Sequence, residues 1–154
     1  MKNGLDTKRA VKLLNRIMEM ELAGVVRYTH YSLMVYGFNR IPIVSWLRKQ
    51  AEDSLMHAQQ AGELVTHLGQ HPSLGIGDLL ETEKHDIGDI LKESLEQERA
   101  TLTLYKELLE LAQGHSVLLE EYARQMVHQE ELHAGEVDKM LRSPGDIKAF
   151  SASR

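Results

Sequence analysis

Apolar residues recur every three to four positions along four long stretches of the chain, which is the spacing of one face of an α-helix. Strand-like alternation is nearly absent. The sequence therefore predicts an all-α protein with helices over about 7–36, 42–68, 86–113 and 116–141. Each stretch is followed by a residue that favours the end of a helix, namely Gly37, Gly69, Gly114 and Pro144.

The lengths of the connections predict the arrangement of these helices. The first and third links are short and favour antiparallel neighbours, whereas residues 70–85 can cross the full length of a bundle. A helix of about 30 residues at ~1.5 Å per residue is about 45 Å long, which matches the other three. We therefore expect an antiparallel four-helix bundle with one long crossover, forming a single domain over residues 1–154.

Each predicted apolar stripe is interrupted near its middle by ionisable residues, which are Glu21, His57, Glu98 and, on the fourth helix, Glu130 with His133. The middles of antiparallel helices of similar length meet at one level. Burying several carboxylates requires a compensating positive charge, and no Lys or Arg lies on these stripes. A pair of divalent metal ions would supply that charge. Carboxylate and imidazole ligands suit iron or manganese, and zinc can also occupy such sites.

The spacing of Glu130 and His133 is weak evidence by itself. Residues three apart share a helix face, and such a pair is usually solvated or hydrogen-bonded. Its weight comes from Glu21, His57 and Glu98 at matching depth on the other three stripes. Ordinary core packing explains the leucines and methionines of the stripes, but it does not explain these charged interruptions. The full pattern therefore predicts a metal site.

Several motifs resemble those of the bacterioferritins, over nearly the whole chain. They are Met20-Glu21-Leu22 with Tyr28, His57-Ala58, the crossover residues Gly69, Pro72 and Leu74, Asp86-Ile87, Glu98, and Glu130-Glu131-Leu132-His133. The resemblance implies a ferritin-like fold and oxidation of ferrous iron at a di-iron centre within one subunit, with mineral stored inside a hollow homo-oligomer. It also implies that Tyr28 lies near the metals, where it could donate an electron or a hydrogen bond.

The second helix departs from the family pattern at a metal ligand. The family has Glu-x-x-His there, but the residue three positions before His57 is Ser54. Asp53 lies four positions before His57, on roughly the same face, and could ligate directly or through water. The alternative is that Asp53 faces solvent or an inner cavity. We expect weaker metal binding at one of the two positions.

Two further departures concern haem and assembly. The methionine that ligates haem in bacterioferritins falls at Leu55, and the adjacent Met56 is rotated by about 100° onto another face of the helix, so haem binding is not expected. After the fourth helix only residues 142–154 remain, where bacterioferritins carry a fifth short helix. This favours a smaller cage or an incomplete assembly.

Composition and charge narrow the other classes of function. The absence of cysteine excludes disulfides, iron–sulfur clusters and thiolate zinc sites, and it suits a cytoplasmic protein. No apolar run approaches the ~20 residues of a membrane span. The formal net charge of −5 argues against nucleic acid as a partner.

Two other functions remain open at this stage. One is a di-metal oxidase or oxygenase that acts on a small organic substrate, which would need an apolar pocket beside the metals. The other is a shell protein with impaired ferroxidase activity. The size of the oligomer distinguishes iron storage in a shell from chemistry on a small molecule.

Overall fold

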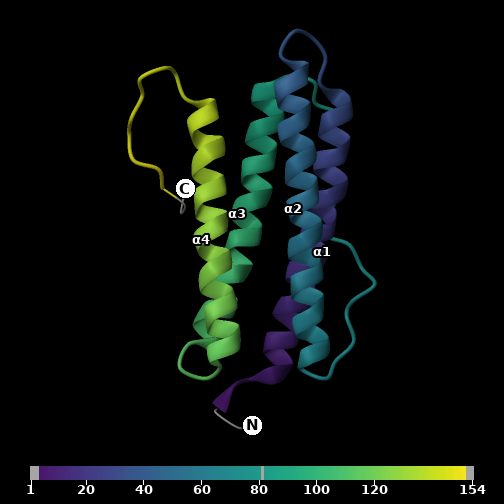
Figure 1. Cartoon of the computed structure of the whole chain (residues 1–154), viewed down its shortest axis with the longest axis vertical. Helices are drawn as coiled ribbons and strands as arrows, with labels where there is room; N and C mark the ends of the chain where they lie inside the picture. The colour runs from purple at the N-terminus through teal and green to yellow at the C-terminus, as the bar shows by residue number, and fades with distance from the viewer. Residues whose placement is uncertain (1–3, 81, 152–154) are drawn as a thin grey trace. The chain divides into compact units, whose positions relative to one another are not determined.

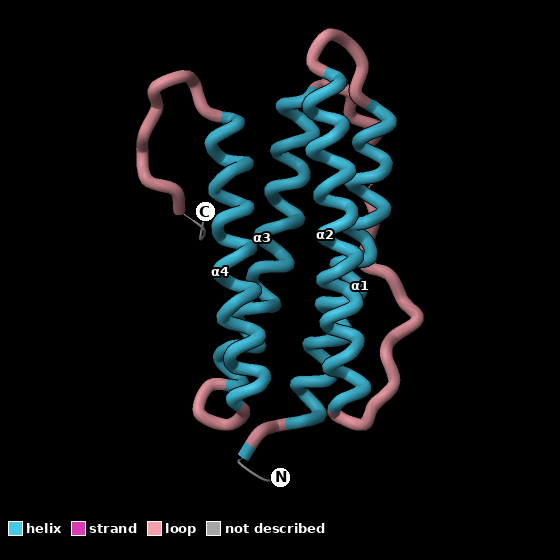
Figure 2. The backbone as a smooth tube through the Cα atoms, in the orientation of Figure 1, coloured by secondary structure: helices cyan, strands magenta, loops and turns pink. Residues whose placement is uncertain are grey.

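The computed structural model describes residues 4–80 and 82–151, and apart from a 3₁₀ conformation at Gly4 all regular structure in this part of the chain is α-helical (Figures 1 and 2). The four helices are α1 (Thr7–Met34), α2 (Arg40–His67), α3 (Ile87–Ala112) and α4 (Val117–Leu141). The prediction of an all-α fold with four helices is therefore confirmed. The chain divides into two compact units, one with α1, α2 and the crossover, the other with α3, α4 and the tail. The single domain predicted over residues 1–154 stays a prediction.

In the first unit, α1 and α2 pack side by side in opposite directions (Figure 1). The carboxylate of Asp6 accepts the backbone N–H of Arg9 at 3.1 Å and caps the start of α1. At its end, the carbonyls of Ser32 and Val35 accept hydrogen bonds from the Arg40 guanidinium at 3.2 and 2.7 Å. Gly37, with φ of +101°, provides the reversal between the helices. The turn is thus held by a side chain of the helix that follows it.

The start of α2 lies earlier than the sequence predicts. The helix begins at Arg40, and Pro42 lies within its first turn rather than opening it. Proline is tolerated there because the first backbone N–H groups of a helix have no acceptor within the helix. The missing N–H of Pro42 therefore costs no hydrogen bond.

The crossover between α2 and α3 is attached to α1. The backbone N–H of Ser73 donates to Asn15 Oδ1 at 2.8 Å, and its hydroxyl donates to Glu19 Oε2 at 2.7 Å. Further along, the N–H of Gly77 donates to the carbonyl of Glu19 at 2.9 Å. A Cβ at position 77 would lie 3.2 Å from that carbonyl oxygen, so only glycine allows this approach without displacement. The predicted long connection is therefore an irregular segment with fixed contacts.

In the second unit, α3 and α4 form the other antiparallel pair. Gly114, with φ of +79°, ends the first of them, and the Ser116 hydroxyl accepts the N–H of Leu119 to cap α4. The Tyr105 and Tyr122 rings meet edge to face with centroids 6.2 Å apart. After α4, residues 142–151 form no helix. The described part of the tail thus contains no equivalent of a fifth helix.

Candidate metal centre

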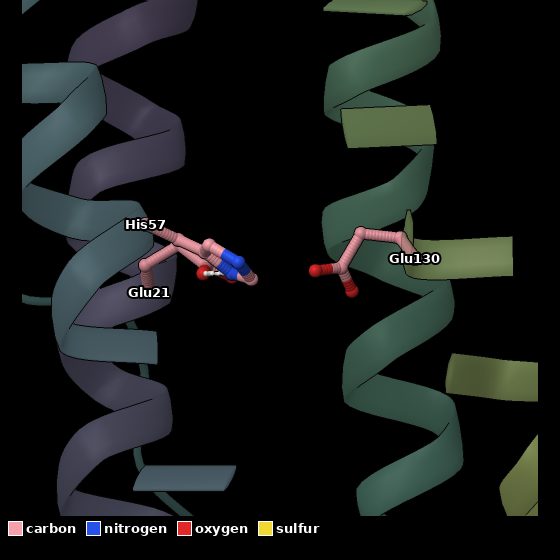
Figure 3. Close-up of side chains that lie close together, drawn as sticks. All are labelled: Glu21, His57 and Glu130. Atoms are coloured by element: carbon pink, nitrogen blue, oxygen red, sulfur yellow. Dashed lines mark hydrogen bonds and ion pairs between the residues drawn. The ribbon is translucent and has the colours of Figure 1, made fainter. Parts of the chain in front are cut away.

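The first two predicted ligands meet across the α1–α2 pair. Glu21 Oε2 lies 2.8 Å from His57 Nδ1 (Figure 3), and the two residues are only 3% and 9% exposed. With its proton on Nδ1, the imidazole donates to the carboxylate. Two ligand atoms at about 2.1 Å from one ion and about 90° apart are separated by about 3 Å. The Glu21 and His57 atoms therefore have the spacing of two neighbouring ligands of one metal ion. The proton between them occupies the place that a cation could take.

The second unit buries two further carboxylates, Glu98 on α3 and Glu130 on α4, which are 7% and 4% exposed. Glu98 lies seven residues before Tyr105 and Glu130 eight residues after Tyr122, whose rings are in contact. In an antiparallel pair, these offsets place the two carboxylates at nearly the same height along α3 and α4. Figure 3 includes Glu130, which extends from α4. The sequence prediction that both side chains are buried is correct.

His133 completes the predicted set on α4. It lies one turn after Glu130, on the same face, and is half-buried. A half-buried imidazole next to a buried carboxylate remains accessible to an ion from solvent. The second unit therefore offers two carboxylates and one imidazole, a donor set that suits iron, manganese or zinc.

Tyr28 is almost fully buried, at 1% exposed, on the same face of α1 as Glu21. Its ring lies edge to face with Tyr31 at 6.3 Å and with Trp46 at 6.5 Å between centroids. These contacts fix the ring in one orientation. Tyr31 and Trp46 therefore have a packing role, because both rings contact Tyr28.

Asp53, the conjectured substitute for the missing carboxylate, is half-buried and forms an ion pair with Lys49 one turn earlier. The hydrogen bond from Lys49 to Asp53 raises the pKa of the lysine above its ordinary value. Such a pair on the outside of a helix is the arrangement expected for a residue that faces solvent. Asp53 as a metal ligand stays a prediction.

Ser54 occupies the place where the family pattern has a glutamate, and the structure shows what it contacts. The residue is 6% exposed. A Cβ built on Gly24 of α1 would lie only 2.9 Å from the Ser54 hydroxyl. A neutral hydroxyl is a much weaker metal ligand than a carboxylate, so this position offers little to a second ion.

Arg27 is a residue that the sequence analysis missed. It belongs to α1 and is only 5% exposed, and its Nε and Nη1 atoms have no hydrogen-bond partner among the described residues. The apolar stripe through Glu21 and Tyr28 contains no Lys or Arg, but the buried face of α1 is wider than that stripe. Gly24, one turn earlier in α1, is the feature of the sequence that could have indicated a buried Arg27, because a residue without a side chain leaves room for a long neighbouring side chain.

None of the described helices is apolar over a length sufficient to cross a membrane. Among curated proteins, none matches this sequence. Three solved structures have the same fold at 22–23% sequence identity. A ferritin-like diiron-carboxylate protein from Bacillus anthracis matches with a TM-score of 0.83, over 89% of this chain and 98% of the other.

The other two similar structures are both related to bacterioferritins. A dodecameric thioferritin, described as the bacterioferritin-related protein from Bacteroides fragilis, gives a TM-score of 0.80, over 89% of this chain and 86% of the other. The bacterioferritin of Desulfovibrio desulfuricans, studied for its diiron site, gives 0.75 over 88% and 79%. These likenesses confirm the predicted ferritin-like four-helix fold. The model of the ferritin-like domain matches residues 11–144, so this chain belongs to the ferritin-like family, as its motifs predict.

Proposed function

We propose that this protein binds ferrous iron as its substrate and oxidises it to ferric iron, which it stores or detoxifies in an oligomeric shell. The observation that carries the proposal is the buried, hydrogen-bonded pair of Glu21 and His57 in a chain of the ferritin-like family. The proposed ligands from the second unit are Glu98, Glu130 and His133. Asp53 is outside the proposed set because Lys49 holds its carboxylate.

The burial of the carboxylates supports a cation at this site. Glu21, Glu98 and Glu130 are each less than one-tenth exposed, and an ionised carboxylate removed from water is costly without a positive partner. A bound divalent ion provides that charge together with the coordination that the lone pairs need. The donor set of carboxylate oxygens and imidazole nitrogens fits iron, and it also fits manganese or zinc.

The chemistry proposed for the site is electron transfer from iron to an oxidant. Each ferrous ion loses one electron. Two such ions reduce one peroxide molecule, with two protons, to two water molecules, or four reduce one dioxygen molecule, with four protons, to two water molecules. The protein's own part is to hold the ion, exclude bulk water and supply the phenol of Tyr28, either as a hydrogen-bond donor or as an electron donor that a further ferrous ion reduces again.

Exposed apolar side chains on the first unit support assembly into an oligomer. Val26, Leu33, Leu55 and Met56 of α1 and α2 are all more than two-fifths exposed. Apolar residues gathered on one pair of helices are typical of a surface that another chain covers. The related protein from Bacteroides fragilis is a dodecamer. Native mass spectrometry tests the shell directly, and a monomer or dimer would instead favour a di-metal oxidase acting on a small organic substrate.

The test of iron oxidation compares two adjacent glutamates of α4. Ferrous iron is added without oxygen, dioxygen or peroxide is then mixed in, and ferric iron is followed by absorbance. Glu130→Ala should abolish the rapid phase. Glu131→Ala should leave it unchanged, because Glu131 is 44% exposed and pairs with Lys106 at 3.3 Å. An equal loss of the rapid phase in both variants would refute the proposal. So would the absence of a rapid phase in the unaltered protein.

A further inference from the structure

The buried guanidinium of Arg27 lies beside the position where the family places its second carboxylate on α2. The Cβ position built on Gly24 is 3.9 Å from Arg27 Nη2 and 2.9 Å from Ser54 Oγ. The guanidinium and the hydroxyl therefore surround the same small space between α1 and α2. Both residues are at least nine-tenths buried.

The pairing of α1 with α2 relates this space to the candidate metal ligands. Glu21 contacts His57, and Gly24, three residues later, lies against Ser54, three residues earlier. Both pairs follow one antiparallel register along the α1–α2 interface. Gly24, which has no side chain, leaves space beside the Arg27 side chain three residues later. Arg27 lies about 120° around α1 from Glu21, and its guanidinium reaches the interface at the Gly24–Ser54 contact, about one turn from Glu21 and His57.

This guanidinium has no negative partner among the described residues. No ion pair involves Arg27, and its Nε and Nη1 donate to no acceptor there. Its Cζ atom lies 5.9 Å from the centroid of the Tyr28 ring, a cation–π contact, but an aromatic ring carries no net charge to neutralise a buried cation. In the proposed site, the neutralising negative charge comes from the buried carboxylates Glu21, Glu98 and Glu130.

We infer that Arg27 supplies the positive charge that a second metal ion provides in a di-iron site, so that each chain binds one divalent ion in its bundle centre. The inference rests on the proposed function. Three ionised carboxylates and one guanidinium leave a charge of two minus, which one divalent ion neutralises. A second ion would leave two positive charges uncompensated in a buried site, with the Ser54 hydroxyl in place of a carboxylate.

The donor set therefore fits the first ion of a di-iron centre and does not fit the second. The serine at position 54, in place of the family's glutamate, does not by itself exclude the second ion. A missing ligand lowers the affinity for that ion, whereas a positive charge at the position repels it. Restoring a carboxylate at position 54 should not restore the second ion either, because the new carboxylate would pair with Arg27. Both residues must change before the second position becomes available.

The test counts metal ions per chain with Zn²⁺, which needs no oxidant. Isothermal titration and elemental analysis after desalting are applied to the full-length protein, and sites that persist in Glu130→Ala are subtracted as surface binding. We expect one ion in the unaltered protein and in Ser54→Glu, and two in Arg27→Gln/Ser54→Glu. Arg16→Gln/Ser54→Glu is the matched control, since Arg16 is an exposed arginine of α1, and it should bind one.

The possible results separate the inference from the function on which it rests. Two ions in the unaltered protein or in Ser54→Glu, or only one in the double variant, would overturn the role of Arg27 and leave iron oxidation standing. No specific ion in the unaltered protein would overturn the proposed function itself.

A second measurement covers the case in which the double variant does not fold. Without metal, Ser54→Glu should raise the melting temperature where Arg27 is present, because the new carboxylate gains a buried cationic partner. In the Arg27→Gln background, a single additional Glu gains no partner and should lower it. An equal shift in both backgrounds would contradict the inference.

Discussion

Gly24 of α1 and Ser54 of α2 are in such close contact that a methyl group at position 24 would lie 2.9 Å from the serine hydroxyl and 3.3 Å from its Cβ. One turn away along the same interface, Glu21 and His57 form the buried pair of the candidate metal centre. The α1–α2 distance at the site is therefore set partly by a glycine that faces the substituted ligand position.

The first prediction concerns this contact. Gly24→Ala should lower the free energy of unfolding by about 1–3 kcal/mol, because the added methyl group forces α1 and α2 apart. Gly135→Ala is the matched control in α4, where the new Cβ would meet Phe150 at an ordinary 3.8 Å. That substitution should stabilise the protein by about 0.5–1 kcal/mol, the usual gain for alanine within a helix. Urea denaturation measures both, and a stabilising Gly24→Ala would contradict the close packing.

The second prediction concerns His57 as a ligand. His57→Gln should lower the affinity for Zn²⁺ by at least about 10-fold, because the amide is a poorer ligand than the imidazole. His67→Gln, at the exposed end of the same helix, is the control and should leave the affinity unchanged. Isothermal titration makes the comparison. Equal affinities in the two variants would remove His57 from the proposed site.

The third prediction separates the two roles open to Asp53. Asp53→Asn should lower the pKa of Lys49, because the carboxylate that accepts the lysine's hydrogen bond is what raises it. Zn²⁺ affinity should stay the same. Nuclear magnetic resonance of the lysine side chains gives the pKa, and titration gives the affinity. A loss of metal binding with an unchanged Lys49 pKa would instead make Asp53 a ligand.

The fourth prediction concerns pH and the turn before α4. The backbone N–H of Gly114, at 3.1 Å, and then Arg124 hold the pKa of Glu120 below its ordinary value. Because the folded pKa is the lower one, this stabilisation is present above the unfolded pKa and is lost as the pH falls through the folded one. Melting temperatures of the native protein and Glu120→Gln should therefore converge in acid. A difference between the two melting temperatures that stays constant from neutral to acid pH would contradict this lowered pKa of Glu120.

The sequence predicts the fold and much of the candidate site because both depend on periodicity within single helices. Glu21, Glu98 and Glu130 interrupt apolar stripes, and each is buried as that position requires. The start of α2 was misplaced by two residues because Pro42 is tolerated within a first turn as well as at its opening. This difference at the start of α2 does not change which face of the helix carries His57.

Arg27 could not be predicted in the same way. Its guanidinium lies 3.9 Å from the Cβ position built on Gly24, at the point where Gly24 packs against Ser54 of α2. The sequence of α1 shows that Arg27 precedes Tyr28, but the periodicity of one helix does not show which residues of α2 the arginine side chain approaches. The charge at this position, and with it the number of metal ions, follows from packing between two helices.

The most direct test of the account is a crystal structure of the iron-soaked protein, with anomalous scattering recorded at the iron edge. We predict one iron peak per chain, in contact with Glu21, His57 and Glu130, and no iron bound by Ser54 or beside the Arg27 guanidinium. A second iron peak in contact with Ser54 or Asp53 would contradict the single-ion site. No peak at the Glu21–His57 pair would contradict the proposed function.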